Sequence, residues 1–282
     1  MHFILIFTAL FIAYTVRSIS TFKQVKYQKK WGLSLFLFTF PPLLLLMTCL
    51  TVFLMGYHGE MWGIKASKFS YYLAEGFVIF AIFTLLKTVW NFHQLSLLVK
   101  EYPLVNINGE DIKIIDTPFP YAAQVGFWDS QLVLSQGLIK LLSPEHLKAV
   151  IAHENAHKMN KDPFFFFWLS YLERLTFWLP NNQNLWNNLL LLRELRADKI
   201  ASKSVDFLLI AEALLTVTNA SIELEKPLKF NWECPFTNCR LEERIDNLLT
   251  ESDESNNFKW WQIIWLFLVF IPWIFYPFHN PC

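Results

Sequence analysis

The chain has 282 residues, of which 54% are hydrophobic, 17% aromatic and 17% charged, whereas a soluble domain ordinarily carries about 25% charged residues. Its 24 basic residues balance its 24 acidic residues, so no net charge attracts the chain to nucleic acid, and we expect no nucleic-acid partner. This composition excludes a disordered chain, a collagen-like repeat and an ordinary soluble enzyme. The four cysteines fit neither a disulfide framework nor a paired CxxC zinc site.

Four apolar stretches are long enough, or nearly long enough, to cross a bilayer, which requires about 20 helical residues. They lie at about 3–20, 33–55, 71–92 and 259–282. For the first stretch, a helix lying on the membrane surface is the alternative. A signal peptide is disfavoured because the region before the apolar run lacks basic residues and no small-x-small cleavage site follows it. A fifth stretch, 164–179, contains Glu173 and Arg174, and we expect a core or membrane-abutting helix there.

The basic residues predict the orientation of these spans. Arg17 and four lysines between residues 23 and 30 separate the first two spans without any acidic residue, and short cytoplasmic loops hold such an excess. The long segment between the third and fourth spans is then also cytoplasmic. Both termini are expected outside.

The cytoplasmic segment begins with two short β-strand patterns. These are Ile112–Ile115 and Gln131–Leu134, separated by prolines and a glycine, which are typical of turns. The run Ser143-Pro144-Glu145 then predicts the start of a helix, because it offers a hydroxyl cap, a proline in the first turn and an acid near the positive end of the helix dipole. We expect this helix to extend through at least His157.

The predicted helix carries His153-Glu154-Asn155-Ala156-His157, an HExxH motif. Residues four apart lie on one face of a helix, so the two imidazoles can hold a single Zn²⁺. Glu154 lies beside that metal, where a carboxylate can accept a proton from a metal-bound water as a general base. The alternative is a pair of surface histidines beside an acid, and it is disfavoured because the chain has only 7 histidines.

Catalytic zinc sites have three protein ligands and an open position, so a third donor is needed. Glu194 and Asp198 lie four residues apart in a helical stretch. We expect Glu194 to be the third ligand and Asp198 to hydrogen-bond a ligand histidine and fix its tautomer. An isolated ExxxD usually marks a solvated helix face, but together with HExxH it predicts a site for one zinc ion. His146 lies two turns before His153, roughly 10 Å away, and is expected to be structural.

These residues resemble those of gluzincin-type integral-membrane metallopeptidases. The stretch 126–163, with the HExxH motif and Asp162-Pro163, is similar to the peptidase domain of the BlaR/MecR-type antirepressor family, and more loosely to the HtpX and CAAX prenyl protease family. The antirepressor resemblance implies three spans, a cytoplasmic zinc domain and a fourth span, whereas HtpX-like proteins place two spans between HExxH and the third ligand. It also implies a bacterial plasma membrane and a protein substrate, with a transcriptional repressor as the candidate.

Two features depart from these families. The antirepressor sensors carry a penicillin-binding domain after the fourth span, and this sequence has only a few residues there, so β-lactam sensing is not expected. The run Leu241–Ile245 resembles the LEERI of HtpX-like proteins, in which the arginine helps to organise the active site, but Asn238 stands where that family has histidine. The resemblance gives Arg244 a supporting catalytic role, with a surface ion pair as an equal alternative, and makes Asn238 a candidate oxyanion donor.

Together, these observations predict a mainly α, four-span membrane protein with a cytoplasmic α+β zincin-like metallopeptidase domain. We assign residues 1–99 to a membrane region with three spans, 100–258 to the peptidase domain and 259–282 to the last span. The predicted function is zinc-dependent hydrolysis of peptide bonds in a protein at the cytoplasmic membrane face, where an extended substrate could add to an edge of the small β layer. The alternatives are a membrane signal transducer whose metal domain mainly binds a partner, and an HtpX-like quality-control protease.

Overall fold

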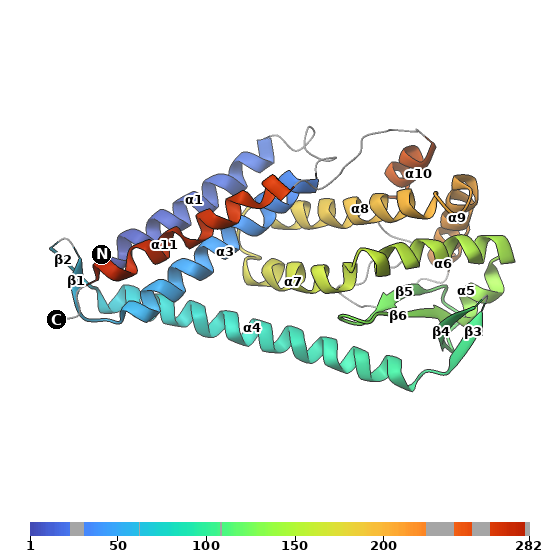
Figure 1. Cartoon of the computed structure of the whole chain (residues 1–282), viewed down its shortest axis with the longest axis horizontal. Coiled ribbons are helices and arrows are strands. Elements are labelled where there is room, and N and C mark those ends of the chain that lie inside the picture. Colours follow the sequence, from blue (N-terminus) through green and yellow to red (C-terminus); the bar gives the residue numbers. More distant parts are fainter. Residues whose placement is uncertain (23–30, 62, 108, 224–239, 250–259, 280–282) are drawn as a thin grey trace. The chain divides into compact units, whose positions relative to one another are not determined.

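The structure, a computed structural model, describes residues 1–22, 31–61, 63–107, 109–223, 240–249 and 260–279. Most of these residues are helical, and the strands form one hairpin and one mixed sheet (Figure 1). The chain divides into two compact units. The first comprises Met1–Val89, Tyr171–Leu189 and Ser255–Cys282, and the second comprises Trp90–Ser170 and Leu190–Glu254.

The first unit contains the most apolar helices. Its elements are α1 (His2–Phe22), α3 (Trp31–Met55), β1 (Glu60–Met61), β2 (Ile64–Lys65), most of α4 (Lys68–Glu101), the 3₁₀-helix η1 (Trp260–Phe270), α11 (Ile271–Ile274) and the 3₁₀-helix η2 (Tyr276–Phe278). Among the described residues, α3 and α4 are long and apolar enough to cross a membrane, judged by length and composition alone. The apolar helices at His2–Ser18 and Ile264–Phe278 are shorter. Four spans are therefore not shown, and the first and fourth remain predictions.

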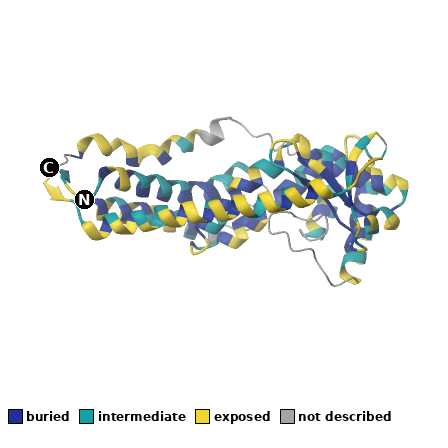
Figure 2. Ribbon diagram, turned by 90° about the horizontal axis from the view of Figure 1, so that it is seen from below, coloured by how far each residue is buried: buried dark blue, intermediate teal, exposed yellow. Residues whose placement is uncertain are grey.

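The two long apolar helices differ in burial. In α3, 67% of the most apolar window is buried within the protein, whereas in α4 the share is 22% (Figure 2). Exposed leucine, isoleucine and phenylalanine side chains therefore follow α4 along much of its length. A contiguous apolar surface of this kind is unusual on a soluble protein and is typical of contact with lipid or another protein.

Two details of this unit differ from the sequence-based expectation. Arg17, assigned to the end of the first span and its basic loop, lies inside α1 and is fully buried. Its guanidinium donates to the carbonyl oxygen of Phe38 at 3.0 Å and to Oδ1 of Asn182 at 3.2 Å, and such acceptors make burial of a charged group tolerable. The predicted C-terminal helix is a 3₁₀-helix as far as Phe270 and becomes α-helical at Ile271, with Pro272 in the first turn of the α-helical segment. Proline lacks an N–H, so it opens a new helical segment more readily than it continues one.

The second unit contains a four-stranded sheet. Its strands are β3 (Leu104–Ile107), β4 (Glu110–Ile115), β5 (Ala122–Val125) and β6 (Gln131–Ser135), in the spatial order β3-β4-β6-β5. The β4–β6 pair is parallel and the two outer pairs are antiparallel. The strands predicted at 112–115 and 131–134 are confirmed. The order leaves β5 at an edge of the sheet.

The helices of this unit begin with α5 (Gln136–Leu141) and α6 (Pro144–Met159). They continue with α7 (Asp162–Leu175), which starts here, α8 (Asn182–Ala201), which ends here, α9 (Phe207–Glu223) and α10 (Leu241–Leu249). The predicted start of α6 is confirmed, since the Ser143 hydroxyl accepts from the N–H of His146 at 3.2 Å. The predicted helix after residue 164 is also present, as α7.

One apolar core holds α6 in place. Ile112, Leu132 and Leu134 of the sheet cluster with Val150 of α6 and Leu214 of α9. This core fixes the side of α6 that bears Val150, because apolar side chains buried on both partners resist rotation of the helix. The HExxH residues of α6 are thereby held at a defined orientation.

Candidate metal centre

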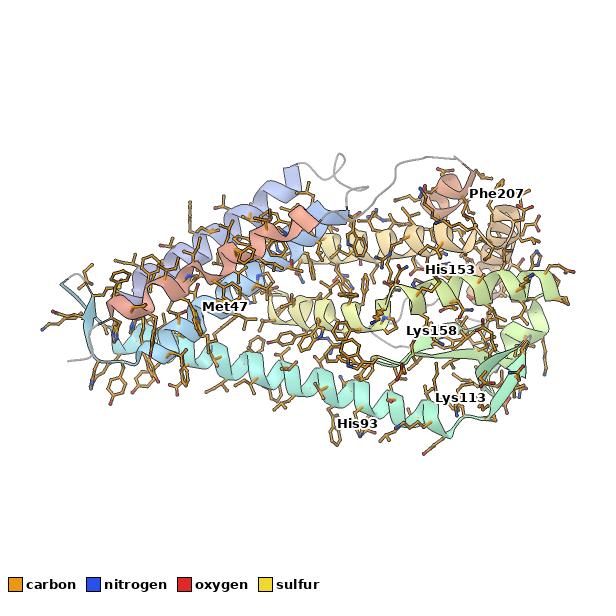
Figure 3. All side chains as sticks on the ribbon, viewed as in Figure 1. Met47, His93, Lys113, His153, Lys158 and Phe207 are labelled. Carbon is orange, nitrogen blue, oxygen red and sulfur yellow. The ribbon has the colours of Figure 1, made fainter. Side chains whose placement is uncertain are left out.

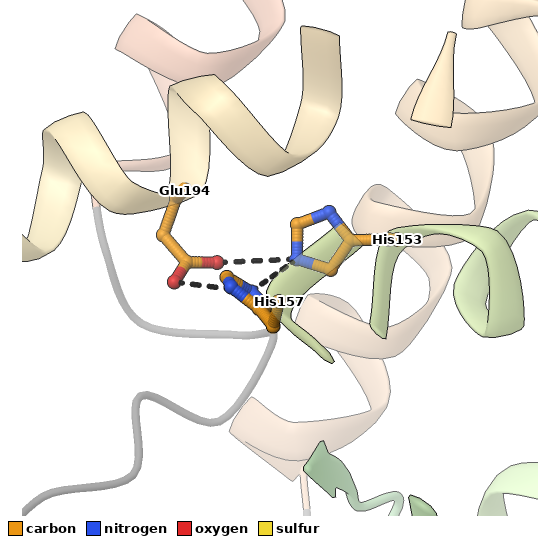
Figure 4. A group of neighbouring side chains, drawn as sticks. All are labelled: His153, His157 and Glu194. Atoms are coloured by element: carbon orange, nitrogen blue, oxygen red, sulfur yellow. Dashed lines mark hydrogen bonds and ion pairs between the residues drawn. The ribbon is translucent and has the colours of Figure 1, made fainter. Parts of the chain in front are cut away.

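Two histidines of α6 and one glutamate of α8 converge on a common point (Figure 4). Nε2 of His153 lies 3.1 Å from Nε2 of His157 and 3.3 Å from Oε2 of Glu194, and Nε2 of His157 lies 3.6 Å from Oε1 of Glu194. All three residues are buried. Ligand atoms around a tetrahedral zinc ion, with Zn–N distances of about 2.0–2.1 Å, are separated by roughly 3.3 Å. The donor spacing therefore fits one zinc ion.

The outer nitrogens of both histidines face carboxylates. Nδ1 of His153 lies 2.8 Å from Oδ1 of Asp198, and Nδ1 of His157 lies 2.7 Å from Oδ2 of Asp162. Because an ionised carboxylate can only accept, each Nδ1 is assigned the proton and each Nε2 directs its lone pair at the common point. With both rings neutral, two lone pairs face each other at this distance and repel, and either a proton or a metal cation between them removes the repulsion.

The electrostatic environment favours positive charge at this point. Burial disfavours the imidazolium form of His157, but the carboxylates of Glu194 and Asp162 outweigh it and raise its pKa to about 10. Burial likewise opposes protonation of His153, and Asp198 nonetheless raises its pKa. The pKa of Glu194 is held well below its ordinary value, against the effect of burial, by His157 and Arg193. A centre that binds protons this strongly also suits a divalent cation.

Arg244 supports the centre through Asp198. Its guanidinium donates from Nε to Oδ2 of Asp198 at 2.8 Å and from NH2 to Oδ1 at 2.7 Å, a bidentate arrangement. A third nitrogen lies 3.5 Å from Oε2 of Glu194. Arg244 is 1% exposed, so it is not part of a surface ion pair. Asn238, the other residue taken from the HtpX resemblance, lies outside the described residues.

A second aspartate–arginine pair, which the sequence analysis did not assign, supports His157. Asp162 is the first residue of α7 and is buried, and NH2 of Arg196 on α8 donates to its Oδ1. Lys161 adopts a left-handed conformation, with φ 54°, at the turn between α6 and α7. This turn returns Asp162 to the histidine five residues before it. An aspartate shortly after HExxH and a second arginine near Glu194 were the only signals available in the sequence.

A hollow adjoins the centre along β5. Glu154 and His157 line it together with Ala123–Gly126, Arg193 and an apolar group, which consists of Phe92, Leu95, Pro163, Phe166 and Phe167. The general-base candidate therefore faces open space next to the metal ligands. His146, expected to be structural, lies outside this centre and contacts Glu212 of α9, at 3.1 Å from Nε2 to Oε2.

A second, more polar hollow lies along the same strand. Asn155 and Lys158 of α6 line it with residues of the β3–β4 hairpin and of β6, and the stick view shows Lys158 near His153 on this helix (Figure 3). Asn155 donates to Oε1 of Glu110 at 2.6 Å, which ties the hairpin to α6. Gln124 of β5 lines both hollows, and its buried side-chain amide has no hydrogen-bond partner in the described part of the chain.

Comparison with known proteins shows that the part of the chain holding these residues is similar to a peptidase family. Residues 101–223 match the sequence model of peptidase family M48. The match runs from the end of α4 to the end of α9 and so includes His153, His157 and Glu194. It ends before Arg244. This part of the chain is thus similar to a metal-dependent peptidase.

A curated relative agrees with this assignment. The chain is 29% identical over 85 residues to Protease HtpX homolog 2 of Sulfurisphaera tokodaii. The aligned part is 29% of this chain and 26% of the relative, so the chain spans about a quarter of that protein's length. No solved structure matches. The comparisons support the looser resemblance to HtpX, and they do not confirm the one to BlaR/MecR-type antirepressors.

Proposed function

We propose that this chain is a membrane-bound zinc endopeptidase that hydrolyses peptide bonds of a protein at the cytoplasmic membrane face. One observation carries the proposal: Nε2 of His153, Nε2 of His157 and the carboxylate of Glu194 converge at zinc-ligand spacing, and Glu154 lines the hollow beside them. The match with peptidase family M48 covers all four residues.

Each residue of the centre has a distinct role in the proposed hydrolysis. When bound, zinc supplies Lewis-acid polarisation of the scissile carbonyl and lowers the pKa of a water molecule. Glu154 is placed to accept the proton of the attacking water and to deliver it to the leaving amine nitrogen. Asp198 and Asp162 hold the imidazole rings in the ligand tautomer. Asn238 stays a candidate oxyanion donor on the family resemblance alone.

The edge of the sheet is suited to hold the substrate. One side of β5 pairs with β6, and no strand in the described part of the chain pairs with its other side, so an extended peptide could add there through its main chain. The unpartnered amide of Gln124 supports this, because leaving a buried amide unpaired costs about 1–3 kcal/mol and a peptide group offers both a donor and an acceptor. The apolar side chains of the first hollow favour a large apolar residue next to the scissile bond.

The membrane assignment is part of the proposal. The length and apolar exposure of α4, together with the length and composition of α3, support two spans, and spans at 3–20 and 259–282 complete the predicted four. The basic residues around 17–30 favour a cytoplasmic peptidase domain at 100–258, outward-facing termini and a bacterial plasma membrane. A membrane region at 1–99 accompanies this arrangement.

Two substrate classes follow from the two family resemblances. The antirepressor resemblance favours a regulatory protein such as a transcriptional repressor, whereas the HtpX resemblance favours membrane proteins removed for quality control. The chemistry is the same in both. A signal transducer that binds a partner without cleaving it is the remaining alternative, and Glu154 argues against it because metal binding alone does not need a general base.

The test combines metal content with cleavage. The full chain is purified in detergent, and wild type, Glu154→Gln and His157→Ala are assayed for zinc and for cleavage of casein and of the chain itself. We expect about one zinc ion per chain in wild type and Glu154→Gln, zinc loss in His157→Ala, and cleavage in wild type alone. Cleavage by Glu154→Gln at the wild-type rate would show that Glu154 is not the general base. Zinc without cleavage in wild type would favour the transducer.

A further inference from the structure

We propose that five residues beside the catalytic hollow form a membrane-contact surface that lies in the headgroup region of the bilayer. They belong to the β5–β6 loop, to the turn between α6 and α7 and to the first half of α7, and we call them the aromatic surface: Trp128, Lys161, Phe164, Phe165 and Trp168. The inference rests on the proposed function, because it takes α4 to be a membrane span.

The aromatic surface is exposed although it is built from large apolar rings. Trp128 is 63% exposed, Phe165 54% and Trp168 42%. Trp128 stacks on Phe164 with 4.4 Å between ring centroids, so the rings support one another while their outer faces stay open. Because removal of apolar surface from water is favourable, these exposed rings favour an apolar or interfacial partner.

The loop that presents Trp128 has a fixed shape. Gly126 has a φ of 142°, and a Cβ atom there would lie 2.6 Å from the carbonyl oxygen of Asp129 and 2.7 Å from Cα of Ser130. Only glycine permits this close approach. The exposed tryptophan is therefore held on a tight, defined turn.

Contacts within the second unit place this surface at the end of the predicted third span. Phe92 is the last residue of the span at 71–92, and its ring lies 5.8 Å from that of Phe127 and 5.5 Å from that of Phe167. Trp128 follows Phe127 directly, and Trp168 follows Phe167. If the span ends at the membrane boundary, both tryptophans lie close to that boundary.

The chemistry of the surface selects a lipid headgroup region over a protein partner. Tryptophan is enriched at membrane interfaces, where an apolar ring and a polar N–H are both accommodated. The Lys161 ammonium lies 5.6 Å from the centre of the Trp128 ring, and an amphipathic lysine beside aromatic rings suits anionic lipid. Phe127 and Phe167, which precede the two tryptophans, also contact Phe92, the residue at which the predicted third span ends, and a protein partner would not require this position.

Spin labelling in vesicles tests the proposal. The full chain with its four cysteines replaced by alanine receives a single cysteine, Trp128→Cys or Phe165→Cys, carries a nitroxide and is reconstituted in phosphatidylcholine–phosphatidylglycerol vesicles. Matched controls are Lys148→Cys, exposed on α6, and Phe83→Cys, exposed within the predicted third span. We expect the ratio of oxygen to nickel-chelate accessibility at 128 and 165 to exceed that at 148 several-fold and to fall below that at 83.

Three results would overturn the proposal. Accessibility at 128 and 165 equal to that at 148 would show a surface in water. Nickel access that is lost only when casein is added would assign the surface to protein substrates. An oxygen-to-nickel accessibility ratio at position 83 equal to that at 148 would show that the predicted third span does not lie in the bilayer, and the proposal requires that span.

A second measurement uses the natural cysteines, in case the cysteine-free chain does not fold. Lipids brominated near the headgroup quench interfacial tryptophans, and Trp128→Phe should lose a distinct part of this quenching relative to wild type. Unchanged quenching would contradict the proposal. Both measurements apply equally to Glu154→Gln, for which we expect no cleavage, so failure of the lipid contact and failure of the peptidase assignment are distinguishable.

Discussion

The two ligand histidines are held by similar devices in different surroundings. His153 contacts Asp198, which Arg244 clamps with two hydrogen bonds, and Arg244 is 1% exposed. His157 contacts Asp162, which accepts from NH2 of Arg196. The side chain of Arg196 is 36% exposed. The same sequence of groups, imidazole to carboxylate to guanidinium, therefore occurs once in the interior and once near solvent.

The difference in exposure distinguishes two contributions of each arginine, to folding and to the orientation of a ligand histidine. Each arginine neutralises a buried aspartate, and each aspartate orients an imidazole. In the interior, a lost arginine leaves a carboxylate without compensation, whereas near solvent water can replace the arginine. The orientation of the two imidazole rings should therefore depend on both aspartates, whereas the stability of the fold should depend more on Arg244 than on Arg196.

The largest effect is expected for Arg244→Met. Methionine fills a similar volume but leaves Asp198 buried without its cation, and breaking a buried ion pair from one side costs about 3–5 kcal/mol. Thermal unfolding of the full chain in detergent, with zinc held constant, measures the loss. The double variant Arg244→Met with Asp198→Asn is the control, since removing both charges should recover part of the stability. No recovery would mean that the contact with Glu194, or packing, matters more than the pair with Asp198.

Asp198→Asn and Asp162→Asn should each weaken zinc binding by about 10–100-fold. Asparagine is nearly isosteric, but its neutral amide is a weaker acceptor for an imidazole N–H and can turn its NH₂ toward the ring. Competition with a zinc chelator measures the dissociation constants. Asp206→Asn, an exposed substitution at the start of α9, is the matched control. Equal affinity in the three variants would rule out orientation by these carboxylates.

Zinc binding should strengthen as the pH rises. The pKa of His157 is about 10 in the metal-free protein, above its ordinary value, so near neutral pH the imidazole carries a proton that zinc must displace. The apparent affinity should increase by at least tenfold for each pH unit above about 7 and level off near pH 10, because zinc displaces the proton of His157 and also competes with protonation of His153, whose pKa is raised as well. Asp162→Asn removes a carboxylate that raises this pKa, and the rise should then end at a lower pH. A flat profile in wild type would contradict the charge balance described for the centre.

Helical spacing made part of the centre predictable from sequence. His153 and His157, and likewise Glu194 and Asp198, lie four apart on single helices, so their shared faces follow from local geometry. The contact of Asp162 with His157 could not be predicted in this way, because it depends on the left-handed turn at Lys161. The contact of Arg196 with Asp162 also could not be predicted, because it depends on how α8 packs beside α7. The apolar helices could be predicted from long stretches of apolar residues. The burial of Arg17 could not, because it depends on hydrogen-bond acceptors from α3 and α8.

The smallest effect is expected for Arg196→Met, and it sharpens the comparison most directly. Because the Arg196 side chain is partly exposed whereas Asp162 is buried, water can take up part of the role of the guanidinium, and the loss of stability should be smaller than for Arg244→Met, about 1–3 kcal/mol. Zinc affinity should fall by less than about tenfold, since Asp162 keeps its charge and its contact with His157. Arg196→Lys should restore most of any loss. Thermal unfolding and chelator competition are measured for Arg196→Met and Arg244→Met side by side. Equal losses of stability in the two variants would show that burial of the arginine does not determine its contribution.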